Sequence, residues 1–243
     1  MTIEAVTFDF WNTLVRENTE LWAYRSRAWS ELLAARGNQI ELAVLQAAFD
    51  AGWHAYVANW NANVPFGAAD ALRVALTALD VEADDELAAA LLAVITDPPA
   101  DHHPHLNPNL LDTLEALRGA GVKIGIVCDV GLTPSAVLRR YLDDQGALEY
   151  FDHWSFSDEV GVYKPDAVIF RHALAGLGDV APERCAHIGD LRRTDIAGAL
   201  GMGMTAVRYT GVFDDPALPD SPLIDADHVI GDHAELPGVL GIG

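Results

Sequence analysis

The sequence predicts an α/β protein with a doubly wound parallel sheet, a Rossmann-like core, into which an all-helical cap domain is inserted. Two observations lead to this fold class. Short runs rich in Val and Ile alternate with longer segments of helical periodicity, and one long interval of the chain contains helical periodicity only. The length of 243 residues is sufficient for one substantial core and an accessory module.

Five apolar runs, each bounded by turn residues, are predicted to be strands: residues 3–10, 122–129, 184–190, 204–211 and 227–232. The segments between the later runs are predicted to be helices: residues 109–121, 133–144, 164–178 and 193–203. Strands that alternate with helices in this way are typical of a parallel sheet, because each helix carries the chain back to the start of the next strand.

The interval 15–107 separates the first two predicted strands. A crossover between parallel strands needs only about a dozen residues, so an interval of this length predicts a helical cap at 15–107. The core domain is then residues 1–14 and 108–243. Helical periodicity covers residues 20–37, 41–60, 68–81 and 84–96. We expect the cap to lie over the strand ends as a lid, and to bury the tryptophans Trp22, Trp29, Trp53 and Trp60 in its own core.

Composition limits the classes of partner. The formal net charge is -21, from 15 basic and 36 acidic residues, and such a surface disfavours nucleic acid and anionic membranes. No segment approaches the roughly 20 consecutive apolar residues that span a bilayer. The first residues lack the basic flank and cleavage site of a secretion signal. We therefore expect a cytoplasmic protein with no nucleic-acid or membrane partner; nothing in the sequence indicates an oligomeric state.

Cysteine and histidine give weaker signals. Cys128 ends one predicted strand and Cys185 begins another, so parallel strands would hold the two thiols too far apart for a disulfide. The connector "DHHPH" contains His102, His103 and His105. Zinc ligation is conceivable there, but exposed histidines of a polar connector usually bind nothing. His187, inside a predicted strand, is expected to be a hydrogen-bonded core residue.

Carboxylates follow three separate predicted strands. Asp9, Asp129 and Asp190 each stand where an apolar run ends, and ligands of open α/β sheets bind outside the carboxyl ends of the strands. Any one of these acids could be a helix cap or a turn residue, but three from different strands predict a common site. Clustered carboxylates repel one another unless a hard cation such as Mg²⁺ holds them. Asp195 follows Asp190 by about one helical turn and adds another acid.

Lysine is rare in this chain. Only Lys123 and Lys164 are present, so a lysine beside the predicted acid edge is informative. Lys164-Pro165 has the pattern of a helix start with Pro at the first position, and the free N–H groups of helix starts bind anions. The compact charge of a lysine suits one phosphate oxygen. Acids, a cation and this lysine together predict a site for a phosphoryl group.

Four segments in order resemble the motifs of the haloacid dehalogenase-like (HAD) superfamily: "DFWNT", "IGIVCD", "VYKPD" and "IGDLRRTD". The resemblance extends nearly from end to end, because the helical interval matches the cap that this family inserts between its first and second motifs. It implies a Mg²⁺-dependent phosphohydrolase that acts on a small phosphorylated metabolite through an aspartyl-phosphate intermediate.

The resemblance also implies a metal site. Asp9 and Asp190 would bind Mg²⁺ through their carboxylates, together with the backbone carbonyl of Trp11. Asp195 would be either a second ligand or a residue of the outer coordination sphere. These are oxygen ligands of the kind that magnesium prefers.

The reacting groups follow from the same resemblance. Asp9 would be the nucleophile that attacks phosphorus, and water would hydrolyse the resulting aspartyl-phosphate. Lys164 would pair with the nucleophile and with the transferring group. Cys128 and Asp129 occupy the positions of the second motif that contact the phosphate.

Three residues depart from the family pattern. Trp11 stands where family phosphatases usually carry a second aspartate, which protonates the leaving oxygen and then activates water. Loss of such a general acid/base typically costs about 10²- to 10⁴-fold in rate. Cys128 replaces the usual Ser or Thr, and Asp129 replaces the common Asn. We hypothesise that Asp129 takes over part of the proton transfer, and we expect a slow or atypical enzyme.

Two alternatives remain at this point. A metal-independent 2-haloacid dehalogenase carries an aromatic residue at the Trp11 position, but usually lacks the pair Gly189-Asp190. The arginine that such enzymes carry early in the cap has no match here, since Ile40 lies near the expected position. The other alternative is a degenerate member that binds a phosphorylated ligand or a partner protein with little turnover.

Overall fold

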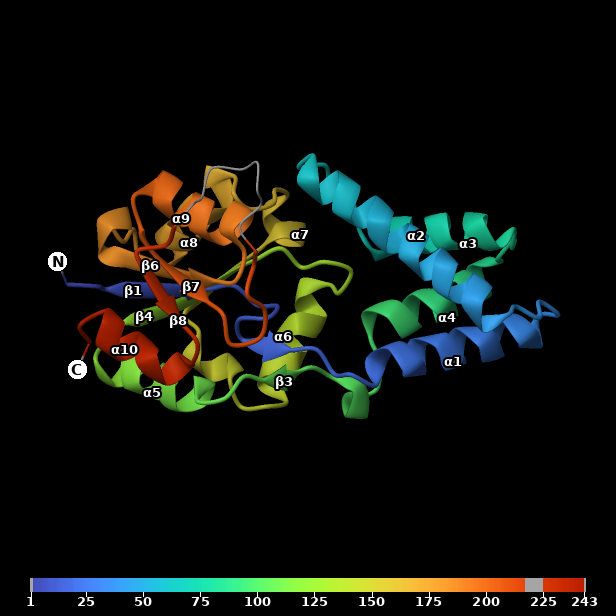
Figure 1. Ribbon diagram of the computed structural model, residues 1–243, viewed down its shortest axis with the longest axis horizontal. Helices are drawn as coiled ribbons and strands as arrows, with labels where there is room; N and C mark the ends of the chain where they lie inside the picture. Colours follow the sequence, from blue (N-terminus) through green and yellow to red (C-terminus); the bar gives the residue numbers. More distant parts are fainter. Residues whose placement is uncertain (1, 217–224, 243) are drawn as a thin grey trace. The chain divides into compact units, whose positions relative to one another are not determined.

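The computed structural model describes residues 2–216 and 225–242, and the chain divides into two compact units (Figure 1). The first, here called the sheet unit, comprises Met1–Glu17, Pro104–Asp129 and Arg139–Gly243. The second, called the helical unit, comprises Asn18–His103 and Val130–Leu138. The chain therefore leaves the sheet unit after residue 17, returns to it at residue 104 and leaves it once more for residues 130–138.

The sheet unit is built on six strands with the spatial order β5-β4-β1-β6-β7-β8, and every pairing is parallel. The strands are β1 (Ala5–Phe8), β4 (Lys123–Cys128), β5 (His153–Phe156), β6 (Cys185–Gly189), β7 (Thr205–Tyr209) and β8 (His228–Ile230). The sequence-based fold class, a parallel α/β sheet with an inserted helical segment, is confirmed. All five predicted strands are present.

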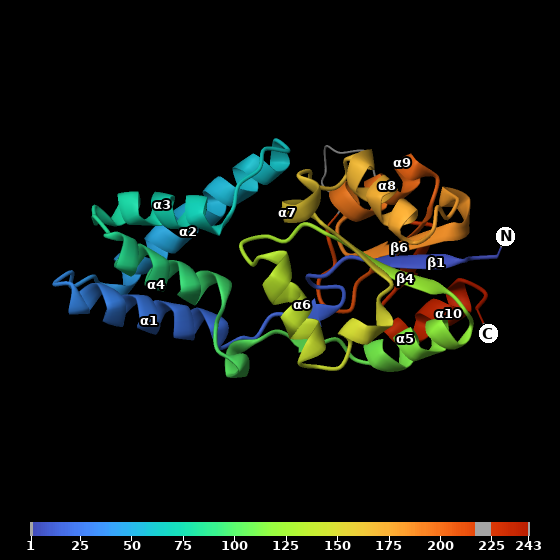
Figure 2. The same ribbon diagram turned by 180° about the vertical axis from the view of Figure 1, so that it is seen from behind.

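Helices cover both faces of this sheet. Figures 1 and 2 show α8 (Ala167–Gly176) and α9 (Ala197–Met202) on one face, and α5 (Leu110–Gly119) and α10 (Leu236–Val239) on the other. Strands covered on both faces become continuous apolar runs, and β1 and β6 are buried along their whole length. A polar side chain of these strands can therefore reach a ligand from solvent only at a strand end.

The structure corrects three details of the sequence interpretation. Strand β5 was not predicted, because "HWSF" is a short edge strand without Val or Ile. A two-residue antiparallel pair, β2 (Val15–Arg16) with β3 (His105–Leu106), is too short to give a periodic signal. Helix α8 begins at Ala167 rather than at Lys164-Pro165, because the Asp166 carboxylate accepts the N–H of Val168 at 2.8 Å and caps the helix there.

The remaining short elements complete the chain. Two helices are α6 (Ser135–Asp143), which spans a border between the units, and α7 (Ser157–Val160). The single turns are η1 (Ala100–His102), η2 (Leu148–Tyr150), η3 (Pro182–Arg184), η4 (Arg192–Ile196) and η5 (His233–Glu235). The turn η4 is the one that matters for the site, because it directly follows the end of β6.

The helical unit consists of α1 (Leu21–Ala35), α2 (Leu42–Asn61), α3 (Ala68–Leu79) and α4 (Asp85–Thr96). Its core is formed by apolar side chains of all four helices, including Trp29, Leu33, Leu45 and Leu91. The indole N–H of Trp29 donates to the carbonyl of Leu91 at 3.0 Å, which satisfies the buried polar edge of the ring.

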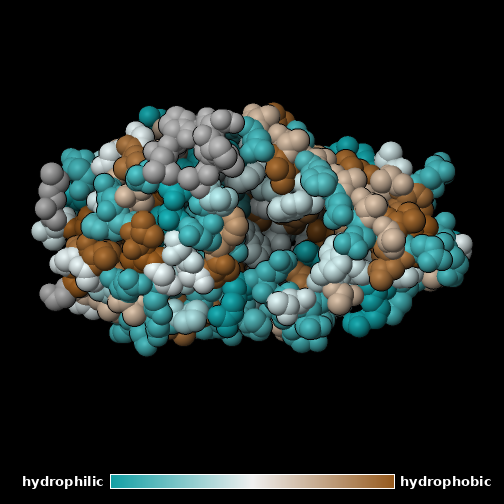
Figure 3. All heavy atoms as spheres, viewed as in Figure 1, coloured by the Kyte–Doolittle hydropathy of each residue, from teal (hydrophilic) through white to brown (hydrophobic). Residues whose placement is uncertain are grey.

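The expectation that the four tryptophans of this unit form its core is only partly correct. Trp29 is fully buried, but Trp22 is 40% exposed and Trp53 is 51% exposed. Leu42 and Val44 of α2 are exposed as well, and Figure 3 shows hydrophobic residues gathered over the helical unit among hydrophilic ones. Helical periodicity identifies an apolar side chain, but not whether another element covers it.

Cys128 and Cys185 are both buried and free, at opposite ends of strands that β1 separates. Among the described residues, none of the helices has the length and apolar character that a membrane span requires.

Candidate active site

Three carboxylates meet at the carboxyl edge of the sheet. Asp9 follows β1 and Asp190 follows β6, and these strands are neighbours whose last paired residues are Phe8 and Ile188. Asp195 comes from the turn η4. One ligand oxygen of each acid lies within 4.8 Å of those of the other two, and all three side chains are buried. The parallel topology therefore brings together acids that are 181 and 186 positions apart in sequence, counted from Asp9.

Asp195 returns to this edge because η4 is a wide turn. The N–H of Ile196 donates to the carbonyl of Leu191, five residues earlier, at 3.2 Å, a π-type geometry that often marks functional sites. Gly189 makes the approach possible, since a Cβ there would lie 2.2 Å from Cγ of Asp195. The glycine of "IGD" is thus required by the close approach of the Asp195 side chain.

Lys164 lies between two of the acids. Its Nζ is 2.5 Å from Oδ1 of Asp9 and 2.6 Å from Oδ1 of Asp195, and the lysine is only 3% exposed. Burial opposes the ammonium charge, but Asp195 and Asp9 raise the pKa of Lys164 well above its ordinary value. The lysine is therefore charged, and its removal would leave two buried carboxylates without a counter-ion.

One lysine does not balance three acids. Burial raises the pKa of Asp9 to about 7, where Lys164 counteracts the shift and Asp195 adds to it. Burial and the charges of Asp9 and Asp195 raise the pKa of Asp190 to about 8. For Asp195, Lys164 and the hydrogen bond from His187 outweigh burial and lower the pKa. Asp9 and Asp190 thus retain protons near neutral pH unless another cation is present.

This donor set fits Mg²⁺. The ligand atoms are carboxylate oxygens, the hard donors that magnesium prefers, and they carry more negative charge than Lys164 neutralises. A divalent ion would offset the burial that raises the pKa of Asp9 and Asp190. Within residues 2–216 and 225–242, Asp9, Asp190 and Asp195 are the one group with metal-ligand spacing.

The loop after β1 holds Asp190 in place. Asn12 has a positive φ of 59°, a conformation that Asn tolerates better than most residues. Its Nδ2 donates to Oδ2 of Asp190 at 3.1 Å. Trp11, by contrast, is partly buried, and its ring packs edge-on against Phe10 with centroids 5.1 Å apart. Sequence reasoning missed the role of Asn12; its signal was an Asn three residues after the first acid.

Two further residues hold this loop through the backbone carbonyl of Thr13. Nδ2 of Asn107 donates to the carbonyl of Thr13 at 2.7 Å, and Nε2 of the buried His233 lies 2.8 Å from the same oxygen. The Thr13 hydroxyl lies 3.5 Å from Oδ2 of Asp9. Neither Asn107 nor His233 could be recognised from the sequence, because both act across long separations in the chain.

The end of β4 contributes Cys128 and Asp129. Oδ1 of Asp129 accepts the backbone N–H of Lys164 at 2.9 Å, and the side chain is 9% exposed. Cys128 is fully buried, and burial followed by the charge of Asp9 raises the pKa of its thiol well above the ordinary value. A protonated thiol is a weak hydrogen-bond donor. Both residues thus belong to the same edge as the acid cluster.

His187 is buried and hydrogen-bonded, as expected, but its partner is a member of the acid cluster. Nε2 of His187 lies 3.0 Å from Oδ1 of Asp195, and Nδ1 lies 2.9 Å from the hydroxyl of Thr7. The sequence pattern placed the histidine in a strand but could not identify these partners.

The histidines of "DHHPH" have separate surroundings. His102 stacks on Tyr24 with ring centroids 4.5 Å apart, and Nε2 of His103 lies 3.0 Å from the carbonyl of Pro98. His105 is an exposed residue of β3. Among the described residues, none of these three histidines belongs to a group of His, Cys, Asp or Glu side chains with metal-ligand spacing.

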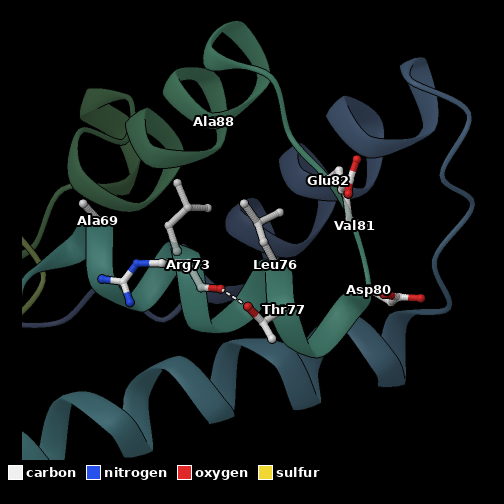
Figure 4. A pocket seen from close by; sticks show the side chains of 9 residues that line it. Ala69, Arg73, Leu76, Thr77, Asp80, Val81, Glu82 and Ala88 are labelled. Atoms are coloured by element: carbon white, nitrogen blue, oxygen red, sulfur yellow. Dashed lines mark hydrogen bonds between the residues drawn. The ribbon is translucent and has the colours of Figure 1, made fainter.

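The helical unit contains a pocket of about 490 Å³, shown in Figure 4. Side chains of α3, of the segment that follows it and of α4 line it: Ala69, Leu72, Arg73, Leu76, Thr77, Asp80, Val81, Glu82 and Ala88. The Thr77 hydroxyl donates to the carbonyl of Arg73 at 2.8 Å. None of the site residues predicted from the sequence lines this pocket.

A sequence model of haloacid dehalogenase-like hydrolases matches residues 3–203. The pyrimidine 5'-nucleotidase YjjG of Escherichia coli is 37% identical over 97 residues, 40% of this chain and 41% of that protein. The glyceraldehyde 3-phosphate phosphatase of Methanothermobacter thermautotrophicus is 33% identical over 134 residues, 54% and 51% of the two chains. The matched segments thus span about half or less of these relatives.

Solved structures resemble the whole chain. A HAD phosphatase from Thermococcus onnurineus is 25% identical, covers 99% of both chains and has a TM-score of 0.64. The HAD-hydrolase YfnB from Bacillus subtilis, bound to magnesium, is 18% identical with complete coverage of both chains and a TM-score of 0.70. A 2-haloacid dehalogenase from Pseudomonas syringae is 24% identical, covers 99% of both chains and has a TM-score of 0.67. The last two likenesses, at under 25% identity, concern the fold alone.

Proposed function

Since the chain belongs to the haloacid dehalogenase-like hydrolase family, we propose that it is a Mg²⁺-dependent phosphohydrolase acting on a small phosphorylated metabolite. The observation that carries this proposal is the position of Lys164 between Asp9 and Asp195, with Asp190 in the same cluster. Nucleophile, counter-ion and metal-ligand oxygens are then within reach of one phosphoryl group. The two curated relatives named above act, by their names, on phosphorylated small molecules.

Asp9 is the proposed nucleophile. One carboxylate oxygen forms a bond to phosphorus while the bond from phosphorus to the leaving oxygen breaks. Water then attacks phosphorus, releases inorganic phosphate and restores the Asp9 carboxylate. Lys164, which donates to Asp9 and Asp195 in the free protein, stabilises the charge that moves from the nucleophile to the phosphoryl oxygens.

Asp9, Asp190 and the backbone carbonyl of Trp11 are the proposed magnesium ligands. Asp195 is proposed as an outer residue, because both of its oxygens already accept hydrogen bonds from Lys164, His187 and the N–H of Leu191. When bound, Mg²⁺ would supply positive charge to the phosphoryl oxygens. Asn12 orients Asp190 for this role.

Trp11 makes the proposed enzyme slow or atypical. Its indole N–H is too weak an acid to protonate a departing alkoxide, and loss of a general acid/base typically costs about 10²- to 10⁴-fold. The cost is largest for leaving groups that are strong bases. Asp129 is the proposed partial substitute, as a carboxyl at the same edge, and Cys128 with Asp129 is proposed to contact the phosphate.

A phosphate-release screen with Mg²⁺ and with a chelator tests the function. Pyrimidine nucleotides, glyceraldehyde 3-phosphate, other sugar phosphates and acyl phosphates form the substrate set, and Asp9→Asn is the control variant. We expect magnesium-dependent release that the variant loses. Chelator-insensitive halide release from 2-haloacids would instead identify a dehalogenase. Silence on every substrate, with measurable binding of a phosphorylated ligand, would identify a binding protein.

A further inference from the structure

A buried hydrogen-bond chain runs from the centre of the sheet to the acid cluster. Thr7 of β1 and His187 of β6 are paired residues of neighbouring strands, so their side chains lie on the same face. Nδ1 of His187 lies 2.9 Å from the Thr7 hydroxyl, and Nε2 lies 3.0 Å from Oδ1 of Asp195. Both Thr7 and His187 have no exposed surface, so neither can contact a substrate directly.

The chemistry of the partners fixes where the proton lies. An ionised carboxylate only accepts hydrogen bonds, so Nε2 of His187 must donate to Asp195. Burial lowers the pKa of His187, although the hydrogen bond to Asp195 opposes that shift, and the neutral ring has one N–H. Nδ1 is then an acceptor, and the Thr7 hydroxyl donates to it. The Asp195 carboxylate thus selects the tautomer, and the Thr7 hydroxyl suits it, with Nδ1 at 2.9 Å as the nearer of its two acceptors and the Ala186 carbonyl at 3.4 Å as the other.

The two oxygens of Asp195 have different donors. Oδ2 accepts from the N–H of Leu191 at 3.1 Å and from the Thr194 hydroxyl at 3.3 Å, both inside or next to the turn η4. Oδ1 accepts from Nζ of Lys164 at 2.6 Å and from Nε2 of His187 at 3.0 Å. His187 therefore holds the same oxygen that holds the lysine.

We propose that His187 is a positioning residue, which keeps Oδ1 of Asp195 where Lys164 can pair with Asp195 and the nucleophile Asp9 together. This inference rests on the phosphohydrolase function proposed above. Nζ of Lys164 is divided almost equally between Asp9 and Asp195, at 2.5 and 2.6 Å. Without the hydrogen bond from His187, Lys164 is the one remaining donor to Oδ1 of Asp195. The lysine then pairs more strongly with Asp195 and moves away from Asp9.

The ring itself is held by packing. Phe170 meets the ring of His187 edge-on, with centroids 5.2 Å apart and an interplanar angle of 88°. Gly198 allows this approach, because a Cβ at that position would lie 2.3 Å from the Phe170 ring. Apolar packing on one side and Thr7 on the other leave the imidazole one orientation, which is what positioning requires.

The test compares His187→Leu with His187→Gln in the complete chain. Leu fills the site but donates nothing, whereas the Gln amide retains an N–H near the place of Nε2. Loss of a hydrogen bond to a charged group predicts a kcat roughly 10- to 100-fold lower for His187→Leu, with KM and the magnesium dependence within about twofold of wild type. His187→Gln is expected to recover most of this loss. Ile169→Val changes the apolar cluster that contains Phe170, the residue packed against the His187 ring. It controls for loss of packing alone.

Two results would overturn the proposal: His187→Leu with a wild-type kcat, or His187→Gln as slow as His187→Leu despite a wild-type melting temperature. ¹⁵N NMR of the His187 ring gives a reading that needs no activity, which matters if the wild-type chain releases no phosphate and the proposed function fails. A proton on Nε2 supports the positioning role in that case, and an Nε2 without a proton contradicts it. The same NMR result decides the matter if a variant does not fold.

Discussion

The two units of this chain bury polar groups for different purposes. At the edge of the sheet unit, Asp9, Lys164 and Asp190 are buried together with more acid than base. In the helical unit, Trp29 and Arg25 instead donate to backbone carbonyls: the Trp29 indole to that of Leu91, and Nη2 of Arg25 to that of Ile95 at 2.7 Å. Unbalanced buried charge costs stability, and proteins retain it where a ligand offsets it. The comparison therefore supports the proposal that the chemistry takes place in the sheet unit.

Among the residues that depart from the family pattern, Asp129 should show the largest effect when it is replaced. Asp129→Asn keeps an oxygen for the N–H of Lys164, which Asp129 accepts at 2.9 Å, but it removes a group that can transfer a proton. If Asp129 substitutes for the missing acid, kcat should fall about 100-fold. Steady-state kinetics of phosphate release measures this. An unchanged rate would remove Asp129 from the mechanism.

Trp11→Asp should act in the opposite direction. It restores a carboxyl two residues after the proposed nucleophile, so we expect a rate gain of roughly 10- to 100-fold for alkyl phosphates. Aryl phosphates, whose leaving groups need no proton, should gain much less. Trp11→Phe is the matched control and should gain on neither class. Equal gains on both classes would show that the effect is not proton transfer.

The helical unit should respond to packing and not to magnesium. Leu91 is fully buried in its core, so Leu91→Ala should lower the free energy of unfolding of this unit by about 2 to 5 kcal/mol. Leu91→Met conserves volume and should cost less than about 1.5 kcal/mol. Denaturant titration with and without Mg²⁺ measures both. A destabilisation that magnesium reverses would contradict the assignment of charge and chemistry to the sheet unit.

The smallest effect concerns pH. Burial raises the pKa of Asp9 to about 7 and that of Asp190 to about 8, from an ordinary value of 3.8. At any pH between the ordinary and the raised pKa values, the folded, metal-free protein therefore binds more protons than the unfolded chain. Stability must therefore fall as pH rises, by on the order of 1 to 2 kcal/mol between pH 6.5 and 8. Buried histidines such as His187 have lowered pKa values and act below this window.

Thermal unfolding with and without Mg²⁺ checks that sign. Magnesium should raise the melting temperature more at pH 8 than at pH 6.5, because it replaces the protons that Asp9 and Asp190 lose. Asp190→Asn should flatten the pH dependence of the metal-free protein. A metal-free protein that becomes more stable over this range would contradict the charge imbalance.

The sequence predicted the parts of the site that depend on topology. Asp9 and Asp190 end neighbouring parallel strands, so a correct strand assignment was enough to bring them to one edge. Their supporting contacts were not predictable. Asn12 reaches Asp190 across 178 positions, and His187 reaches Asp195 only because Gly189 lets the turn η4 come close. Such contacts depend on side-chain geometry that no periodicity encodes.

The differences between the predicted and the observed fold also have local causes. Strand β5 lies at the sheet edge, where His153 and Trp154 replace the usual β-branched residues. The proline pattern predicted that α8 starts at Lys164-Pro165. The helix starts later, at Ala167, because the side chain of Asp166 caps it. These errors did not affect the site, since Lys164 reaches the acids from the loop before the helix.

Trapping the phosphorylated protein tests most directly whether Asp9 is the nucleophile. The chain is mixed with a turned-over substrate in Mg²⁺, quenched in acid within one turnover and digested for mass spectrometry. We expect one phosphoryl group on the peptide that contains Asp9, absent with chelator and absent in Asp9→Asn. Phosphate release that continues undiminished in Asp9→Asn, or a phosphoryl group carried on another residue, would contradict it.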